Sequence, residues 1–267
     1  MRMKLLLAAA MAATLATPAL ADKSDKRTDD PDKPVVKGDE RGELPSLREV
    51  FDTTEYGDLF QQQRVEQDGD YNDSEIDQTE GRQGLASLIQ EGNRNTSYIS
   101  QSDRPDAAGS PFSFAANIAI VDQDGNRNHS YIEQVGDNRE RRFANRADVH
   151  QVGRRNNADV FQAYNDQGLV VVSQGDDGTN EPSPVQDNTA YVAQVASTDS
   201  AVFVTQTGDG NEAYVVQEYA YESKVALQQD GNYDYAEIYQ TGAYNDIHAL
   251  QTGGEYNELY IDQDGYL

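Results

Sequence analysis

The chain has 267 residues with no Cys and no Trp, and its 47 Asp and Glu against 21 Lys and Arg give a formal net charge of −26. So acidic a surface repels nucleic acid and anionic membranes, and we expect neither as a partner. The absence of Cys excludes a disulfide framework, so the fold must be held by other interactions.

Residues 1–21 have the pattern of a secretory signal peptide. Arg2 and Lys4 precede a short apolar run, and the segment ends in Ala-Leu-Ala at Ala21. The run is too short to span a bilayer, and no later stretch is apolar enough to do so. We therefore expect a secreted protein, extracellular after cleavage, with no transmembrane segment.

Residues 22–60 are highly charged and mostly poor in apolar side chains, and they contain Pro31, Pro34 and Pro45. A stretch of this composition buries too little apolar surface to offset its ordering entropy. We predict a largely disordered N-terminal tether, followed by one repeat region over residues 61–267.

The repeat region is built from a seven-residue unit, Asn-x-Ala-x-Val-x-Gln, which is intact in Asn211-Glu-Ala213-Tyr-Val215-Val-Gln217. We count fifteen copies, and residues 61–67 are a worn sixteenth. Five copies begin with Gly, Ser or Asp in place of Asn. In intact stretches the closing Gln recurs about every 11 or 12 residues.

The period inside each unit is two, so the named residues share one face of a strand. Short Gly-containing turns separate the units, and two strand-turn arcs make one coil of about 22–23 residues. Coils of this kind stack as rungs about 4.7–4.9 Å apart. The sequence predicts an all-β fold, a β-solenoid with an amyloid-like cross-β arrangement.

Each inward face offers only two apolar side chains, a core too thin to hold the stack by hydrophobic burial alone. Stacked side-chain amides can donate to one neighbouring rung and accept from the other, which satisfies buried polar groups and keeps the register. We therefore predict a structural ladder formed by Gln67, Asn72, Gln78, Gln90, Asn95, Gln101, Gln123, Asn128, Gln134, Gln151, Asn156, Gln162, Gln194, Ser200, Gln206, Gly208, Asn211, Ala213, Gln217, Ser223, Gln229, Gly231, Gln240, Asn245, Gln251, Asn257 and Gln263.

These residues carry a resemblance to the curlin repeats of bacterial curli fibres, Ser-x5-Gln-x-Gly-x-x-Asn-x-Ala-x3-Gln. The coil from Ser200 to Gln217 matches every named position, and the coil from Ser223 to Gln240 departs only by Asp for Asn. The resemblance covers roughly residues 61 to 267. The loops at 102–116 and 137–142 depart from the pattern and are expected to interrupt the stack, whereas residues 175–187 are expected to lengthen a third turn.

The resemblance implies a secreted subunit that self-assembles into extracellular amyloid fibres for adhesion and biofilm matrix. It further implies other curlin subunits and a curli-type outer-membrane secretion channel as partners. The residues themselves form no convergent catalytic constellation, so we expect no enzymatic activity and no cofactor. Major subunit, nucleator and accessory or inhibitory member all remain open. Because the repeat runs almost to Leu267, we expect the last rung to be uncapped and able to template further pairing.

Calcium binding is the alternative reading of the repeat region. Asp-Gly turns recur, first at Asp68-Gly69, and stacked turns can align carboxylates as ligands, as in secreted calcium-binding β-rolls or adhesin passengers. Those rolls use a shorter, glycine-paired unit, and Asp-Gly is also ordinary turn chemistry. We therefore expect no metal site.

The His and Tyr side chains carry no catalytic pattern. His129, His150 and His248 fall on the outward phase of different units, whereas catalysis needs groups that converge in a pocket. Tyr98, Tyr131 and Tyr214 occupy equivalent outward positions; ordinary strand propensity and an exposed aromatic row explain them equally well.

The acidic surplus bears on assembly. Acidic residues fall largely on outward positions and in turns, so stacking is expected to bring like charges together from rung to rung. Such repulsion opposes aggregation. Acid and salt are therefore expected to promote assembly.

Overall fold

The protein is described by a computed structural model over residues 61–79, 83–103, 116–136, 145–175 and 187–265. The predicted signal peptide and the predicted tether lie outside these described residues, so both stay predictions. The described residues form strands numbered β1 to β16 and contain no helix long and apolar enough to cross a membrane.

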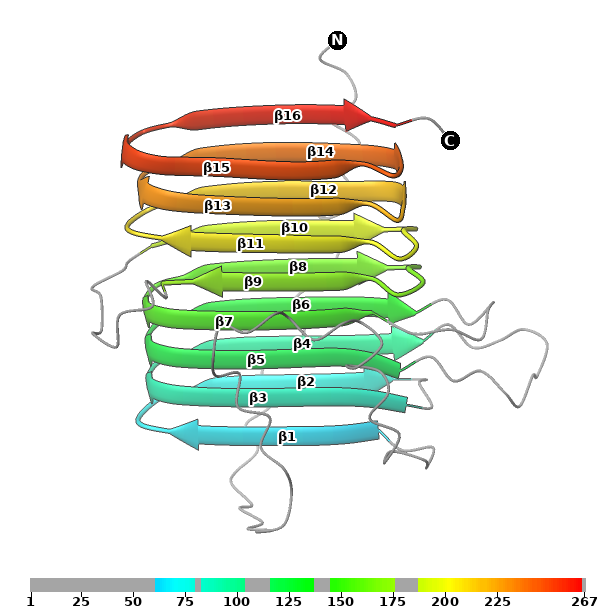
Figure 1. Cartoon of the computed structure of the whole chain (residues 1–267). Coiled ribbons are helices and arrows are strands. Elements are labelled where there is room, and N and C mark those ends of the chain that lie inside the picture. Colours follow the sequence, from blue (N-terminus) through cyan, green and yellow to red (C-terminus); the bar gives the residue numbers. More distant parts are fainter. Residues whose placement is uncertain (1–60, 80–82, 104–115, 137–144, 176–186, 266–267) are drawn as a thin grey trace, which may run out of the picture. The chain divides into compact units, whose positions relative to one another are not determined.

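The strands form two parallel sheets of eight strands each (Figure 1). We call the sheet of odd-numbered strands the odd sheet; it contains β1 (Gln61–Asp68), β3 (Gln83–Asn93), β5 (Ala116–Asn126), β7 (Arg146–Arg154), β9 (Leu169–Gln174), β11 (Ala201–Thr207), β13 (Lys224–Asn232) and β15 (Asp246–Glu255). The even sheet contains β2 (Asp73–Thr79), β4 (Thr96–Asp103), β6 (His129–Gly136), β8 (Asn157–Ala163), β10 (Thr189–Val195), β12 (Glu212–Tyr221), β14 (Tyr235–Ala243) and β16 (Glu258–Asp264).

Each coil contributes one strand to each sheet, and equivalent repeat positions lie opposite each other on neighbouring strands. Gln206 of β11 lies opposite Gln174 of β9 and Gln229 of β13. Ladder partners are 22 or 23 residues apart where no long loop intervenes, as at Gln206 and Gln229. The predicted all-β solenoid is confirmed, and β1 is the worn sixteenth unit.

The loops at 102–116 and 137–142 do not interrupt the stack, contrary to expectation, and the strands on either side of residues 175–187 also stay in register. β3 pairs with β5, β4 with β6, β6 with β8 and β8 with β10 in continuous register, although 28 to 33 residues then separate ladder partners. The cost of closing a loop grows slowly with its length, and parallel pairing requires only that the strand itself returns in register. Surface loops are therefore tolerated between rungs.

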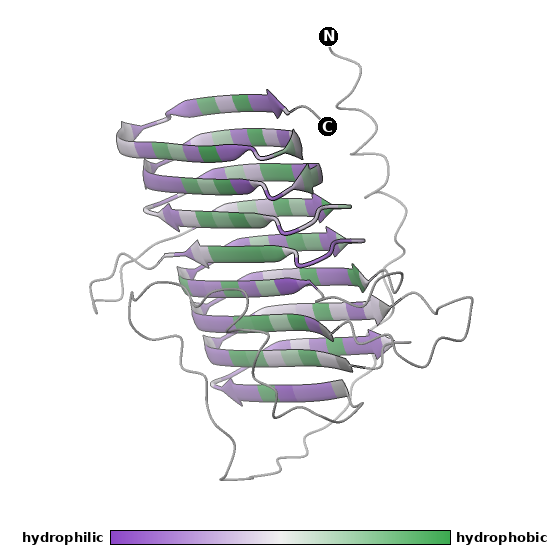
Figure 2. Ribbon diagram, turned by 45° about the vertical axis from the view of Figure 1, so that its right-hand side comes forward, coloured by the Kyte–Doolittle hydropathy of each residue, from purple (hydrophilic) through white to green (hydrophobic). Residues whose placement is uncertain are grey.

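The interior is a thin apolar column with polar residues on both sides of it (Figure 2). In β11 the exposure alternates strictly, and Val202 and Val204 are buried while Phe203 between them is only half-buried. The equivalent inward positions of β12 are buried in the same way, and Ala213 and Val215 have no exposed surface. The predicted assignment of inward and outward faces agrees with this burial.

The turns place backbone next to backbone. Gly208 has a φ of 100°, and a Cβ added there would lie 2.0 Å from the carbonyl oxygen of Gly231 in the next rung. Gly231 itself does not have a positive φ. In many turns the residue just before the first residue of a repeat unit has a positive φ although it is not glycine, as Tyr233 does before Asp234.

We predict that Gly208→Ala lowers the free energy of unfolding by at least about 2 kcal/mol more than Gly253→Ala does. Gly253 also has a positive φ, of 66°, but nothing lies within 4 Å of its added Cβ. Comparing the two variants therefore separates the cost of the steric contact with the next rung from the cost of a positive φ alone. Urea unfolding of freshly purified protein measures both values; equal losses would contradict the close approach.

Candidate functional site

The closing Gln residues form two continuous amide ladders, one along each sheet. In the odd sheet each Nε2 donates to the Oε1 of the next Gln over 2.7 to 3.0 Å, joining Gln67, Gln90, Gln123, Gln151, Gln174, Gln206, Gln229 and Gln251. In the even sheet the same bonds span 2.6 to 3.4 Å and join Gln78, Gln101, Gln134, Gln162, Gln194, Gln217, Gln240 and Gln263.

The Gln amides also tie the two sheets together. Nε2 of Gln206, in the odd sheet, donates to the backbone carbonyl of Thr189 in β10 over 2.9 Å. Nε2 of Gln217, in the even sheet, donates to the carbonyl of Ser223, just before β13, over 3.2 Å. Both hydrogens of these buried amides are thus used, one along the stack and one across it. Register and sheet spacing depend on the same side chain.

A second column, at the start of each even strand, is built from Asn side chains. The Oδ1 of Asn188 accepts the backbone N–H of Asn211 over 2.9 Å. Nδ2 of Asn211 donates to the carbonyls of Thr207 and Gly231, each over 3.0 Å. The column therefore anchors the turn glycines as well, and its members are Asn72, Asn95, Asn128, Asn156, Asn188, Asn211, Asp234 and Asn257.

The corresponding column of the odd sheet is mixed. The backbone N–H of Asn245 donates to the hydroxyl of Ser223 over 3.1 Å, and the N–H of Ser223 donates to that of Ser200 over 3.3 Å. Ala213, which we placed in the ladder, is a fully buried apolar residue opposite Ala190 and Ala236. It packs in the core and contributes no side-chain hydrogen bond.

Several structural residues lie outside the predicted set. Gln174 belongs to the odd ladder and Asn188 to the Asn column, and the repeat spacing already marks both. Asn165 and Ser197 lie in the wide arcs after β8 and β10, where the Asn165 Oδ1 accepts the N–H of Ser197 over 2.9 Å. These two fall outside the seven-residue unit, so its pattern could not indicate them.

Asp234 replaces Asn in the column and is almost fully buried. Its Oδ1 accepts the N–H and Nδ2 of Asn257, over 2.9 and 2.8 Å. Its Oδ2 corresponds to the amide nitrogen of the other members and has no hydrogen-bond partner. The single substitution thus removes a donor where the column otherwise supplies one, which costs free energy.

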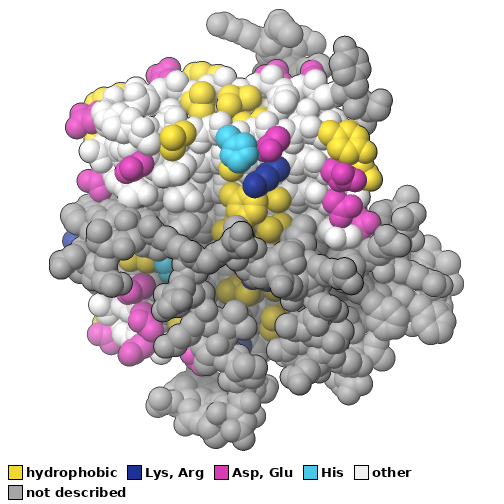
Figure 3. All heavy atoms as spheres, in the orientation of Figure 1, with side chains coloured by type: hydrophobic (Ala, Val, Ile, Leu, Met, Phe, Trp, Pro, Cys, Tyr) yellow, Lys and Arg dark blue, Asp and Glu magenta, His cyan; other side chains and the backbone are white. Residues whose placement is uncertain are grey.

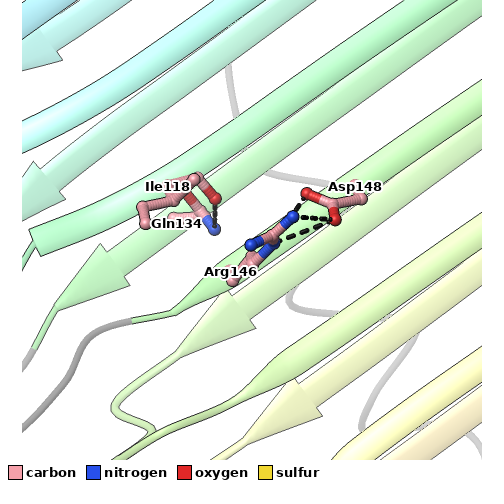
Figure 4. A network of polar contacts seen from close by, with 4 residues as sticks. All are labelled: Ile118, Gln134, Arg146 and Asp148. Atoms are coloured by element: carbon pink, nitrogen blue, oxygen red, sulfur yellow. Dashed lines mark hydrogen bonds and ion pairs between the residues drawn. The ribbon is translucent and has the colours of Figure 1, made fainter. Parts of the chain in front are cut away.

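The outward face carries local ion pairs and half-buried carboxylates. Arg146 binds Asp148 on the same strand over 2.6 Å, on the outer surface, while Gln134 donates to the backbone of Ile118 inside (Figure 4). Burial raises the pKa of Asp148, against the opposing effect of its hydrogen bond and charge pairing with Arg146. Burial likewise raises the pKa of Asp159, against the nearby His129.

The histidines lie apart on the outer surface. His129 begins β6, His150 lies in β7 at 3.9 Å from Asp122, and His248 lies in β15 at 3.1 Å from Asp246. On the face seen in Figure 3, acidic side chains are scattered among neutral ones. No group of three or more His, Asp or Glu among the described residues is placed to hold a metal ion.

The outward Tyr residues form short rows. The rings of Tyr98 and Tyr131 stack at 5.2 Å, and Tyr191 and Tyr214 lie 6.2 Å apart. Between these pairs the register places Asp159, so the predicted aromatic row is broken there. Burial, followed by the charge of Glu237, raises the pKa of Tyr235 to about 12.

No family model and no curated protein matches the chain. The two Gln ladders are the candidate functional site because they hold each rung to the next and run to both ends of the described stack.

We predict that Gln217→Ala lowers the free energy of unfolding by about 2–6 kcal/mol, because one Nε2 hydrogen of Gln194 loses its acceptor and the Oε1 of Gln240 loses its donor, at about 1–3 kcal/mol each. Glu212→Ala, exposed in the same strand, is the control and changes stability by less than about 0.5 kcal/mol. Chemical denaturation compares the two. Equal losses would mean that the ladder does not hold the rungs.

We predict that Asp234→Asn raises the free energy of unfolding by about 1–3 kcal/mol, because the new Nδ2 can donate as the other Asn residues of the column do. The reverse change one rung away, Asn211→Asp, should lower it by a similar amount. Denaturation midpoints of the two variants measure both effects. Destabilisation by Asp234→Asn would show that the carboxylate is matched to its surroundings.

Proposed function

We propose that this protein is a secreted structural subunit that assembles end to end into curli-type cross-β fibres, for adhesion and biofilm matrix. The observation that carries the proposal is the open edge at each end of the stack. Within the described residues, β1 and β2 each pair on one side only, as do β15 and β16, while every strand between them pairs on both sides. Open strand edges are templates for further pairing.

The ladder bonds give the two ends complementary chemistry. Every Gln–Gln bond of the two ladders runs from the Nε2 of the earlier rung to the Oε1 of the later one. The β1–β2 end therefore presents Oε1 acceptors, and Gln78 Oε1 is buried there with no partner. Gln263, in the last strand, accepts from Gln240 within the ladder, and no later rung of the described stack offers an acceptor to its own amide.

The apolar column also continues to both ends. Ile76 in β2 and Leu259 and Ile261 in β16 are only partly buried, whereas the apolar residues at the equivalent positions of interior rungs are buried. Joining a second copy in the same register would cover these side chains and complete both ladders. The apolar and polar parts of the interior thus favour the same contact.

The proposal that the protein is a secreted subunit of the curli type rests on the curlin-like spacing of the repeats and on the signal-peptide pattern. We propose that the chain crosses the outer membrane through a curli-type secretion channel and joins other curlin subunits at the cell surface. The open edges and the polarity of the ladders support a fibre subunit over a monomeric calcium-dependent β-roll.

We predict that purified protein forms fibres that bind amyloid dye and diffract with a meridional spacing of about 4.7–4.8 Å, and that circular dichroism shows the same β-structure with calcium or with chelator. Dye fluorescence, fibre diffraction and the paired dichroism spectra measure this. A soluble monomer persisting at high concentration without cross-β reflections would overturn the proposal. Folding only in calcium would favour the β-roll.

A further inference from the structure

Acidic residues on the outer surface of the even sheet avoid one another inside the stack. In the strand pairs that the structure describes, each faces Tyr or another uncharged residue; Glu212 lies opposite Thr189 and Tyr235, and Glu237 opposite Tyr214 and Tyr260. The expectation of like charges from rung to rung is therefore wrong for this sheet. In the odd sheet it holds only at the strand ends, in the row Asp68, Glu91 and Asp124.

The two end strands of the even sheet differ from the strands between them. β2 carries Asp73, Glu75 and Asp77 on its outer face, all exposed. β16 carries Glu258, Asp262 and Asp264, also exposed. Each acidic row meets only uncharged residues on its one neighbouring strand. Both open edges of this sheet are therefore strongly negative.

The register of the stack defines how the ends would meet. Every neighbouring pair of even strands sets closing Gln opposite closing Gln. Continuing that register from β16 onto β2 of a second copy places Gln263 opposite Gln78. It then places Glu258 opposite Asp73 and Asp262 opposite Asp77. The one contact that completes the ladders also creates carboxylate pairs that the interior avoids.

The odd sheet does not add to this repulsion. Setting Gln251 of β15 opposite Gln67 of a second copy places Leu250 opposite Glu66 and His248 opposite Arg64. Leu250 is 64% exposed in the described structure and would gain a neighbour. No carboxylate lies opposite another along these strands in the continued register. The charge conflict is confined to the β16–β2 half of the contact.

We propose that Asp73, Asp77, Glu258 and Asp262, the junction acids, form an electrostatic gate that limits end-to-end joining of two copies of this chain. The inference rests on the proposed fibre function. Paired strands are about 4.7–4.9 Å apart, less than the screening length of about 8 Å at physiological salt, so the repulsion is felt when the ends meet. Like charges directly opposite each other oppose strand pairing.

The gate differs in a measurable way from a general effect of net charge. Glu212 and Glu237 lie on the same outer face, but in β12 and β14, where neither meets a carboxylate. Changing these two alters net charge as much as changing Glu258 and Asp262 does. A gate at the ends responds only to the second pair.

The test compares Glu258→Gln/Asp262→Asn with the matched control Glu212→Gln/Glu237→Gln in seeded fibre elongation at low salt. We expect the end variant to elongate about fivefold faster than the control, and salt to accelerate it less. The charge-reversing variant Glu258→Lys/Asp262→Lys should elongate fastest at low salt and slow down as salt is added. Monomer dichroism confirms that each variant is folded.

The outcomes separate this inference from the proposed function. Equal elongation rates and equal salt dependence in the end variant and the control would overturn the gate while leaving fibre formation in place. Failure of the original protein and of every variant to form fibres at any salt would overturn the fibre function and the gate with it. Acceleration restricted to the end variants, with a reversed salt dependence for Lys, is the result that supports the gate.

Discussion

The stack depends on the amide hydrogen bond between closing Gln residues of neighbouring rungs. Most strands bury only two apolar side chains of their repeat unit, such as Val202 and Val204, so hydrophobic burial alone does not specify which rungs pair. A buried amide that loses its partners costs more than a surface polar group, because water cannot replace them. A shift of one residue would turn every Gln outward. The ladders therefore enforce a single register over both sheets.

The same bond shapes the remainder of the coil. Because Gln206 and Gln217 reach the backbone at the start of strands in the opposite sheet, the ladder also holds the two sheets at a constant separation. The Asn column then binds the turn carbonyls, and the close approach of Gly208 to Gly231 requires glycine at that point. Long loops are compatible with all of this because they leave each strand and its two columns unchanged.

A ladder of this kind has no intrinsic end. Its donors and acceptors are unequally distributed, with acceptors at β1 and β2 and donors at β15 and β16, so one end matches the other in hydrogen bonding and in apolar surface. The outer surface of the even sheet opposes that match, because Asp77 and Asp262 belong to the positions that would meet. In the proposed fibre, attraction between the ends would come from the interior and restraint from the surface.

The sequence by itself determined the all-β solenoid, the inward phase and most ladder members, because a period of two and a recurring Gln describe an environment that is the same in every rung. Only the tertiary structure decided that the stack passes the three loops unbroken and that Ala213 packs instead of bonding. It also showed the orphaned Oδ2 of Asp234 and that the strands at both open edges of the even sheet carry acidic rows facing uncharged neighbours. Each of these features depends on a partner residue 20 or more positions away in the chain. Such pairings are set by the closure of whole coils, so the local sequence pattern does not reveal them.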